Sequence, residues 1–119
     1  MIKIKRIYDP LNDNDGYRIL VDRLWPRGVS KESAHIDLWM REIAPSSELR
    51  KWFNHDTQKW EEFSKRYTKE LIKNKQMILD IKKLEKEHKT VTLLYGAKDT
   101  EHNQAQVLLN VLKNKMISE

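Results

Sequence analysis

The spacing of apolar residues changes several times along the chain, which predicts strands that alternate with helices. Residues 2–8 and 36–41 alternate apolar with polar side chains, so each predicts a short strand, although 36–41 also suits a short helix. The segments 17–22 and 90–95 contain apolar runs without a clean two-residue period, which is typical of strands covered on both faces. These four segments are the predicted strands.

Between and after these strands, apolar residues recur every three or four positions, which predicts helices. Pro45 breaks the chain, and Ser46 is placed to cap a short helix that contains Leu49, a role we favour over that of a nucleophile. Asp56 is the expected N-cap of a longer amphipathic helix, and the last helix is expected to begin near Thr100. The apolar faces of the three long helices are expected to contain Trp60, Phe63, Tyr67 and Leu71; Ile78, Ile81 and Leu84; and Ala105, Leu108, Leu109, Leu112 and Met116.

The order of these elements predicts an α/β fold, with a mostly parallel sheet of about four strands flanked by helices. With 119 residues, the chain is expected to form a single domain, 1–119, that is large enough for a core of its own. The first two strands are joined by the turn-rich segment 9–16, so they could instead form an antiparallel pair.

The composition excludes several classes of protein. There is no cysteine, so disulfides, thiolate catalysis and cysteine-ligated zinc are excluded. No apolar run approaches the roughly 20 residues of a membrane span, and residues 1–6 alternate charged with apolar residues, unlike a signal peptide. We therefore expect a cytoplasmic protein with no membrane partner.

The net charge of +5 marks a basic protein and raises the question of an anionic partner. The distribution of charge weakens a nucleic-acid interpretation, because Glu61 and Glu62 lie four positions before Lys65 and Arg66 and can pair with them on a helix. A basic surface without a specific partner is the simplest interpretation, a small anionic ligand comes next, and nucleic acid is less favoured.

One segment concentrates chemically useful residues directly after the second predicted strand. It reads Asp22-Arg23-Leu24-Trp25-Pro26-Arg27-Gly28. Pro26 lacks a backbone donor and Gly28 tolerates a positive φ, so the strand must end here. In open α/β sheets, ligands bind outside the carboxyl ends of the strands. The sequence therefore predicts a ligand site at this edge.

A second loop follows the strand 90–95 and contains Lys98 and Asp99, with His102 and Asn103 expected in the first turn of the last helix. A helix N-terminus favours anions. If the two strands are parallel neighbours, the two loops share one edge of the sheet and several cations converge there. The predicted ligand-binding residues are Arg23, Trp25, Arg27, Ser46, Arg50, His55, Lys98 and Asn103.

Three residues are candidates for catalysis. His102 is the candidate acid or base, because an unperturbed imidazole titrates near pH 6.5, and Asp99 or Asp22 would orient it. Structural roles compete with these assignments: Asp99 suits an N-cap, Arg23 could merely pair with Asp22 or Asp99, and Trp25 could close the end of the core rather than stack on a ligand ring.

Motifs for cofactors and metals are absent from the sequence. It contains no dinucleotide or P-loop glycine motif, no His-Glu-x-x-His and no Gly-x-Ser-x-Gly. In the turn at 9–16, aligning Gly16 with the glycine of a calcium loop places Leu11 at the first ligand position, which rejects calcium. The four histidines show no metal-ligand spacing. We predict neither a cofactor nor a metal.

Several strings of the sequence resemble the signature of the YeaO-like family of uncharacterised bacterial proteins. The most specific string runs from Asp15 to Val29, and the others are Ala44-Pro45-Ser46, Leu49-Arg50-Lys51-Trp52-Phe53, His55-Asp56, and Tyr95-Gly96-Ala97-Lys98-Asp99 with His102-Asn103. The resemblance covers essentially the whole chain. It implies a compact cytosolic α/β domain whose activity is not established.

The chain departs from the family pattern at two positions. The family usually has proline where this chain has Thr57 and serine where it has Gly96, which puts any role of that serine hydroxyl in doubt here. Longer relatives carry a Cys-His-Arg string after the corresponding last strand, and that chemistry cannot be transferred to a chain without cysteine.

These observations lead to one functional hypothesis and two alternatives. The hypothesis is a pocket at the carboxyl edge of the sheet for a small phosphorylated or carboxylated molecule, with acid/base catalysis as an open question. The first alternative is a nucleic-acid-binding module in which Trp25 stacks on a base. The second is a protein-interaction domain without catalysis.

Overall fold

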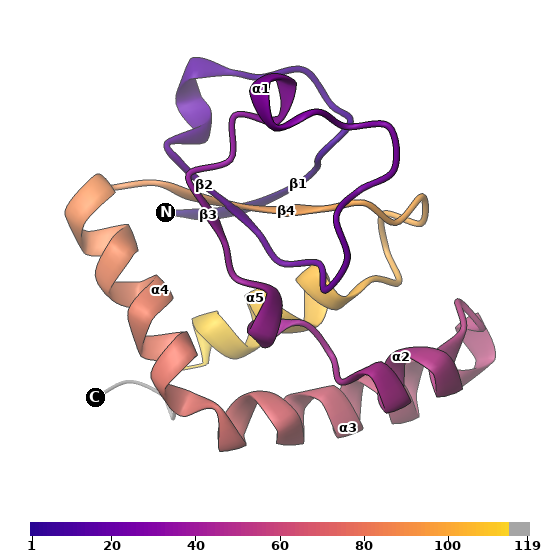
Figure 1. Ribbon diagram of the computed structural model, residues 1–119. Coiled ribbons are helices and arrows are strands. Elements are labelled where there is room, and N and C mark those ends of the chain that lie inside the picture. Colours follow the sequence, from indigo (N-terminus) through magenta and orange to yellow (C-terminus); the bar gives the residue numbers. More distant parts are fainter. Residues whose placement is uncertain (115–119) are drawn as a thin grey trace.

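Four strands form one sheet in which every pairing is parallel (Figure 1). The computed structural model describes residues 1–114. The strands are β1 (Ile2–Arg6), β2 (Tyr17–Leu20), β3 (Leu38–Trp39) and β4 (Val91–Tyr95), in the spatial order β1-β4-β2-β3. The helices are α1 (Lys31–Ala34), α2 (Ser47–Phe53), α3 (Trp60–Lys73), α4 (Lys75–His88) and α5 (Gln104–Lys113), with short 3-10 turns at Asp13–Asp15, Arg41–Ile43 and Thr57–Lys59. The predicted α/β class and parallel sheet are confirmed.

The antiparallel alternative for the first two strands is wrong, because β4 lies between them. Val91 is in register with Ile2 on one side and with Tyr17 on the other. All five residues of β4 are buried, which is what a central strand covered on both faces requires. The last strand in sequence therefore holds the first two together.

The third predicted strand is shorter than expected. Within 36–41 only Leu38–Trp39 is a strand, and it pairs with the end of β2. As an edge strand it has one neighbour, and the chain turns into a 3-10 helix at Arg41. The Asp37 carboxylate caps this edge by accepting a hydrogen bond of 2.8 Å from the backbone N–H of Arg18.

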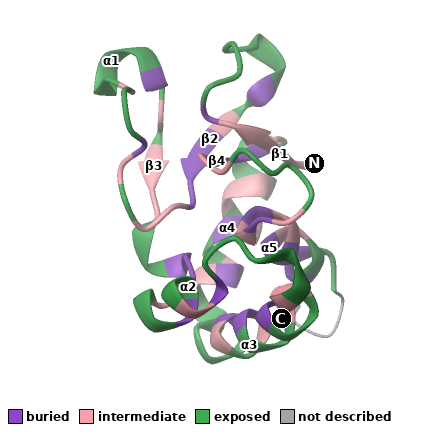
Figure 2. Cartoon of the chain, turned by 90° about the vertical axis from the view of Figure 1, so that its right-hand side faces the viewer, coloured by how far each residue is buried: buried purple, intermediate pink, exposed green. Residues whose placement is uncertain are grey.

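The sheet separates two apolar clusters. Figure 1 shows α3, α4 and α5 on one side of the sheet, and α1 with the long loops on the other. The larger cluster packs the helices against one face of β2 and β4. The smaller cluster consists of Ile7, Leu20, Ala34 and Leu94, over which Trp25 and Trp39 pack. In the burial view the strands β2 and β4 are largely buried, whereas α1 and its flanking loops are largely exposed (Figure 2).

Of the predicted helix starts, that of α2 is confirmed, whereas α3 begins at Trp60, later than the Asp56 cap predicted for it, and the last helix also begins later than expected. Ser46 caps α2 through the N–H of Leu49, and Asp56 caps the 3-10 turn that leads into α3. Helix α5 begins at Gln104 with Asn103 as its N-cap, not near Thr100. The Asn103 side chain accepts a hydrogen bond from the backbone N–H of Gln106 and so caps the start of α5. Of the predicted apolar face of this helix, Met116 lies outside the described residues.

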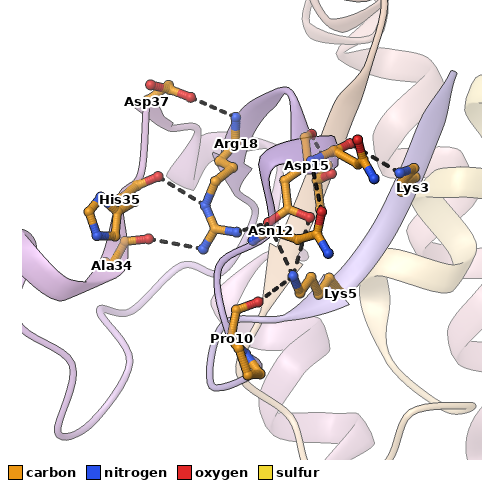
Figure 3. A network of polar contacts seen from close by, with 11 residues as sticks. Lys3, Lys5, Pro10, Asn12, Asp15, Arg18, Ala34, His35 and Asp37 are labelled. Carbon is orange, nitrogen blue, oxygen red and sulfur yellow. Dashed lines mark hydrogen bonds and ion pairs between the residues drawn. The ribbon is translucent and has the colours of Figure 1, made fainter.

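A buried polar network fixes the turn between β1 and β2 (Figure 3). The Arg18 guanidinium forms an ion pair with Asp15 and donates to the carbonyl oxygens of Ala34 and His35 at 3.0 Å. Lys5 also contacts Asp15, at 3.1 Å. Burial alone would raise the pKa of Asp15, but hydrogen bonds from the backbone of Asn12 and from Lys5 and Arg18 hold it below its usual value. Every charged group here has a partner, so the network is structural.

Candidate functional site

A cavity of about 540 Å³ opens at the carboxyl ends of the strands. It is lined by the segment that follows β2, residues 22–27, and by the segment that follows β4, residues 96–97 and 102–104. Residues 44–45, 50–51 and 53–55, together with Tyr8 and Phe63, complete its wall. This volume lies within the range of small-molecule sites, about 300–1,000 Å³, and the location is the edge at which α/β sheets bind ligands.

The structure brings together most of the residues predicted for the site. The predicted residues that line the cavity are Asp22, Arg23, Trp25, Arg27, Arg50, His55, His102 and Asn103. Three others lie outside its wall. Lys98 is exposed on the loop after β4, Asp99 reaches the cavity only through His102, and the Ser46 hydroxyl donates to Glu70 at 2.6 Å.

Asp22 lies where the two loops and α5 meet. Its Oδ2 accepts a hydrogen bond of 2.8 Å from the backbone N–H of Gly96, and its Oδ1 accepts one from the Gln104 side chain. No basic side chain within residues 1–114 forms an ion pair with this carboxylate. Burial raises the pKa of Asp22 to about 6, although both hydrogen bonds act to lower it. The cavity therefore contains a carboxylate that lacks a countercharge.

Arg23 is held by backbone carbonyls rather than by a carboxylate of the site. Its Nε donates to the carbonyl oxygen of Pro45 at 3.0 Å, and one terminal nitrogen donates to that of Ala44 at 3.1 Å. Its nearest acidic group is the exposed Glu42, at 3.7 Å. The expectation that Arg23 pairs with Asp22 or Asp99 is therefore wrong, because its guanidinium donates to backbone carbonyls and forms an ion pair with neither carboxylate. Arg23 fixes the 44–45 wall of the cavity.

The exposed side of the cavity is positively charged. Arg27, Arg50 and Lys51 line it and are exposed. In the part of the chain that the structure describes, none of these three side chains forms a hydrogen bond, an ion pair or a cation–π contact. The Arg27 loop is held by its backbone, whose carbonyl oxygen accepts a hydrogen bond of 2.9 Å from the Tyr8 hydroxyl. The guanidinium groups stay available for an external anion.

His102 is held in one orientation by its neighbours. Its Nδ1 lies 2.9 Å from Oδ2 of Asp99, and its ring meets the Trp60 ring edge-on at 5.2 Å between centroids. Hydrogen bonds from the backbone N–H groups of Glu101 and His102, and then from the His102 ring, lower the pKa of Asp99. Asp99 thus caps the turn before α5 and orients an imidazole that lines the cavity.

Trp25 packs mainly as part of the smaller apolar cluster. Its indole N–H donates to the carbonyl oxygen of Val29 at 2.6 Å, and its ring lies edge-on to Trp39 at 5.3 Å. These contacts use the polar end of the side chain and fix its plane. Trp25 closes the end of the core and at the same time forms part of the cavity wall.

Two adjacent residues at the cavity have a left-handed backbone. Asn54 has a φ of 44° and His55 a φ of 58°. Non-glycine residues rarely adopt this conformation, which costs on the order of 1 kcal/mol or more for each residue. The conformation ends α2 abruptly and positions the His55 imidazole at the edge of the cavity. The imidazole is tilted against the Phe53 ring, with 6.5 Å between the ring centroids.

Sequence reasoning missed Gln104, Tyr8 and Lys51, which all line the cavity. Tyr8 follows β1, so the rule that ligands meet the carboxyl ends of parallel strands would have pointed to it. Lys51 adjoins Arg50 and could have been found as a basic pair. No sequence signal distinguishes Gln104, whose role depends on the tertiary contact with Asp22.

No group of three or more histidine or acidic side chains within residues 1–114 could hold a metal ion. No helix in the same part of the chain has the length and apolar character needed to cross a membrane.

Comparison with known proteins places the chain in a family. The family model described as "Inactive DUF488-N3 subclade" matches residues 1–119. The chain belongs to this family. The Escherichia coli K12 protein "Uncharacterized protein YeaO" is 45% identical over 116 residues, which cover 95% of this chain and 97% of that protein. The "Uncharacterized protein Mb3100c" of Mycobacterium bovis is 32% identical, with 96% of this chain and 95% of that protein covered. No solved structure matches the chain.

Membership of the DUF488-N3 subclade confirms the resemblance of this chain to YeaO-like proteins. The structure also explains why glycine suits position 96, where the family usually has serine. A Cβ atom added at Gly96 would lie 3.0 Å from Oδ2 of Asp22, so a side chain at this position would crowd the carboxylate. Glycine at position 96 allows Asp22 to approach the end of β4 closely.

Proposed function

We propose that this protein binds a small molecule through a phosphate or carboxylate group in the cavity between the loops that follow β2 and β4. The observation that carries the proposal is the exposed set of Arg27, Arg50 and Lys51, whose charged groups lack partners among residues 1–114. Cations gathered at a concave surface attract anions from solution. Arginine binds phosphate and carboxylate through paired charge-assisted hydrogen bonds.

Binding without turnover is the form of the proposal that we favour. The family to which the chain belongs is described as inactive, and the chain has no cysteine that could act as a nucleophile. In this form of the proposal, His102 donates a hydrogen bond to the bound anion rather than transferring a proton.

Acid/base catalysis is a second candidate function, and the contact between His102 and Asp99 supports it. A carboxylate on Nδ1 leaves Nε2 of the imidazole as the atom available to a ligand, and this is the arrangement of an oriented general base. The two candidates differ in one readout. Phosphorus or proton NMR of a bound ligand over hours would show conversion if His102 acts as a base, and an unchanged spectrum if the protein only binds.

The nucleic-acid alternative gains less support from the geometry. Trp25, the expected stacking residue, has its indole N–H and one ring edge engaged within the protein. Binding through many phosphates would weaken steeply with salt, whereas a single-anion site would show a shallow dependence. An interaction domain without a small ligand is the remaining alternative, and it predicts no ligand-induced rise in melting temperature.

The proposal is tested by isothermal titration with inorganic phosphate, ribose 5-phosphate and citrate against wild type and matched variants. Arg27→Ala and Arg50→Ala each remove a cation of the cavity, and we expect each to weaken binding about 10- to 100-fold, as the loss of a charge-assisted hydrogen bond would. Lys83→Ala is the control, because it removes an exposed positive charge on α4, away from the cavity. Equal effects of the three substitutions, or no binding of any anion by wild type, would refute the proposal.

A further inference from the structure

The cavity contains a negative charge as well as positive charges, and the negative charge forms no ion pair with the positive ones. Asp22 is partly buried in the wall, whereas Arg27 and Arg50 are exposed at the opening. No ion pair joins Asp22 to either arginine, nor to any other basic group in the described chain. A site that served only an anion would not place an uncompensated carboxylate in its wall, because a carboxylate repels anions.

Arg23 and His102, which line the same cavity as Asp22, have other partners. Arg23 donates to two backbone carbonyls and lies near Glu42, and His102 contacts Asp99. The groups that do contact Asp22 are neutral: the backbone N–H of Gly96 and the side-chain amide of Gln104. Each oxygen of an ionised carboxylate can accept two hydrogen bonds. Both oxygens of Asp22 therefore keep an accepting position.

We infer that the ligand is bipolar: its phosphate or carboxylate binds at Arg27 and Arg50, and a positively charged nitrogen on the same molecule binds Asp22. This inference rests on the proposed function, since it assigns the second end of the same ligand. The class comprises phosphorylated or carboxylated amines and amidines. An ammonium or amidinium donor supplies both the missing countercharge and N–H groups for the free positions on Asp22.

Gln104 strengthens this assignment. Its NH₂ group points to Asp22, and no hydrogen bond within residues 1–114 uses its carbonyl oxygen. The wall of the cavity thus offers two kinds of acceptor side by side, a carboxylate and an amide oxygen. Acceptors of this kind suit a nitrogen with more than one N–H. Burial raises the pKa of Asp22. A cation bound beside the carboxylate would favour its ionised form and lower that pKa again.

The test compares ligands that differ only at the nitrogen. One pair is glucosamine 6-phosphate and glucose 6-phosphate, and the other is O-phosphoethanolamine and monoethyl phosphate. Guanosine monophosphate is a control, because its base has N–H donors but no positive charge. We expect the amine in at least one of the two amine pairs to bind 10-fold or more tightly than its partner at pH 7.5. Asp22→Asn should remove this preference, and it should bind the amine-free partner at least as tightly as wild type does, because it removes a carboxylate that repels anions.

Two further measurements separate the outcomes. Asp13→Asn makes the same chemical change at an exposed site outside the cavity and should preserve the preference. Carboxyl-carbon NMR should show that the amine lowers the pKa of Asp22. If both members of each amine pair bind equally, or if Asp22→Asn weakens both equally, the bipolar assignment is overturned while the anion site stands. If no phosphorylated compound binds, the proposed function fails as well.

Discussion

The backbone N–H of Gly96 donates a hydrogen bond of 2.8 Å to Oδ2 of Asp22 and so joins the ends of β4 and β2 at the wall of the cavity. The two residues are 74 positions apart in the sequence. Their contact exists because β4 is the direct parallel neighbour of β2, with Leu94 in register with Leu20. The same contact sets the position of the carboxylate on which the inference about the ligand depends.

Asp22 is expected to lower the stability of the folded protein at neutral pH. Its pKa rises from 3.8 to about 6 on folding, so the folded state binds more protons than the unfolded state between about pH 4 and pH 6. The contribution of Asp22 to stability therefore falls as pH rises through this window, by up to about 3 kcal/mol.

We accordingly predict that Asp22→Asn is about 1–3 kcal/mol more stable than wild type at pH 7.5, with little difference near pH 4. Urea unfolding of both proteins at several pH values measures this difference. Taking the difference between the two proteins cancels the titration of all other groups. A variant that is less stable than wild type at pH 7.5 would show that Asp22 is a stabilising group and would contradict this account.

Gly96→Ala is predicted to disturb Asp22 without straining the backbone. The added Cβ would lie 3.0 Å from Oδ2, so the carboxylate must move by a few tenths of an ångström and its bond to the N–H of residue 96 weakens. Because that bond lowers the pKa of Asp22, we expect the pKa to rise further, as measured by carboxyl-carbon NMR.

Gly28→Ala is the matched control for this substitution. Its Cβ would meet nothing within 4 Å, but its φ of +78° strains any other residue. We expect a loss of about 1 kcal/mol in stability and no change in the titration of Asp22. A larger effect on Asp22 from position 28 than from position 96 would refute the proposed role of the Gly96 contact.

The network of Arg18 and Asp15 is predicted to be essential for folding and irrelevant to the ligand. Arg18→Met leaves the buried Asp15 carboxylate with Lys5 as its remaining cation, at a cost of about 3–5 kcal/mol. Arg66→Met removes an exposed pair with Glu62 and should cost less than about 1 kcal/mol. Urea unfolding compares the two, and similar costs would show that burial of the network contributes little.

Most of the site prediction came from the rule that ligands bind at the carboxyl ends of parallel strands. For parallel neighbouring strands it placed the segment after the strand 17–22 beside the segment after the strand 90–95, and the structure shows both in one cavity wall. The rule requires parallel strands, which the alternation of strands and helices indicates, and it also requires the two strands to be neighbours, which we assumed. Neither strand order nor the position of β4 between β1 and β2 is encoded in a local pattern.

The two errors have different causes, a choice between neighbouring caps for the last helix and a contact between distant residues for Arg23. The last helix was predicted to begin near Thr100 because Asp99 is a good capping residue. In the structure Asp99 caps a turn through the N–H groups of Glu101 and His102, and Asn103 caps α5 one turn later. Arg23 was expected to pair with a carboxylate, but the carbonyl oxygens of Ala44 and Pro45 are its partners, and backbone acceptors leave no sequence signal.

The most direct test of the central claim is an NMR titration of the isotope-labelled protein with ribose 5-phosphate at pH 7.5. If the cavity binds the anion, saturable shifts will appear in the backbone amides of residues 22–25, 27, 50–55 and 96–104. The Arg27→Ala variant will need about 10- to 100-fold more ligand to reach the same shifts. Shifts spread over α3 and α4, or the absence of saturable shifts, would contradict the claim that this cavity is an anion-binding site.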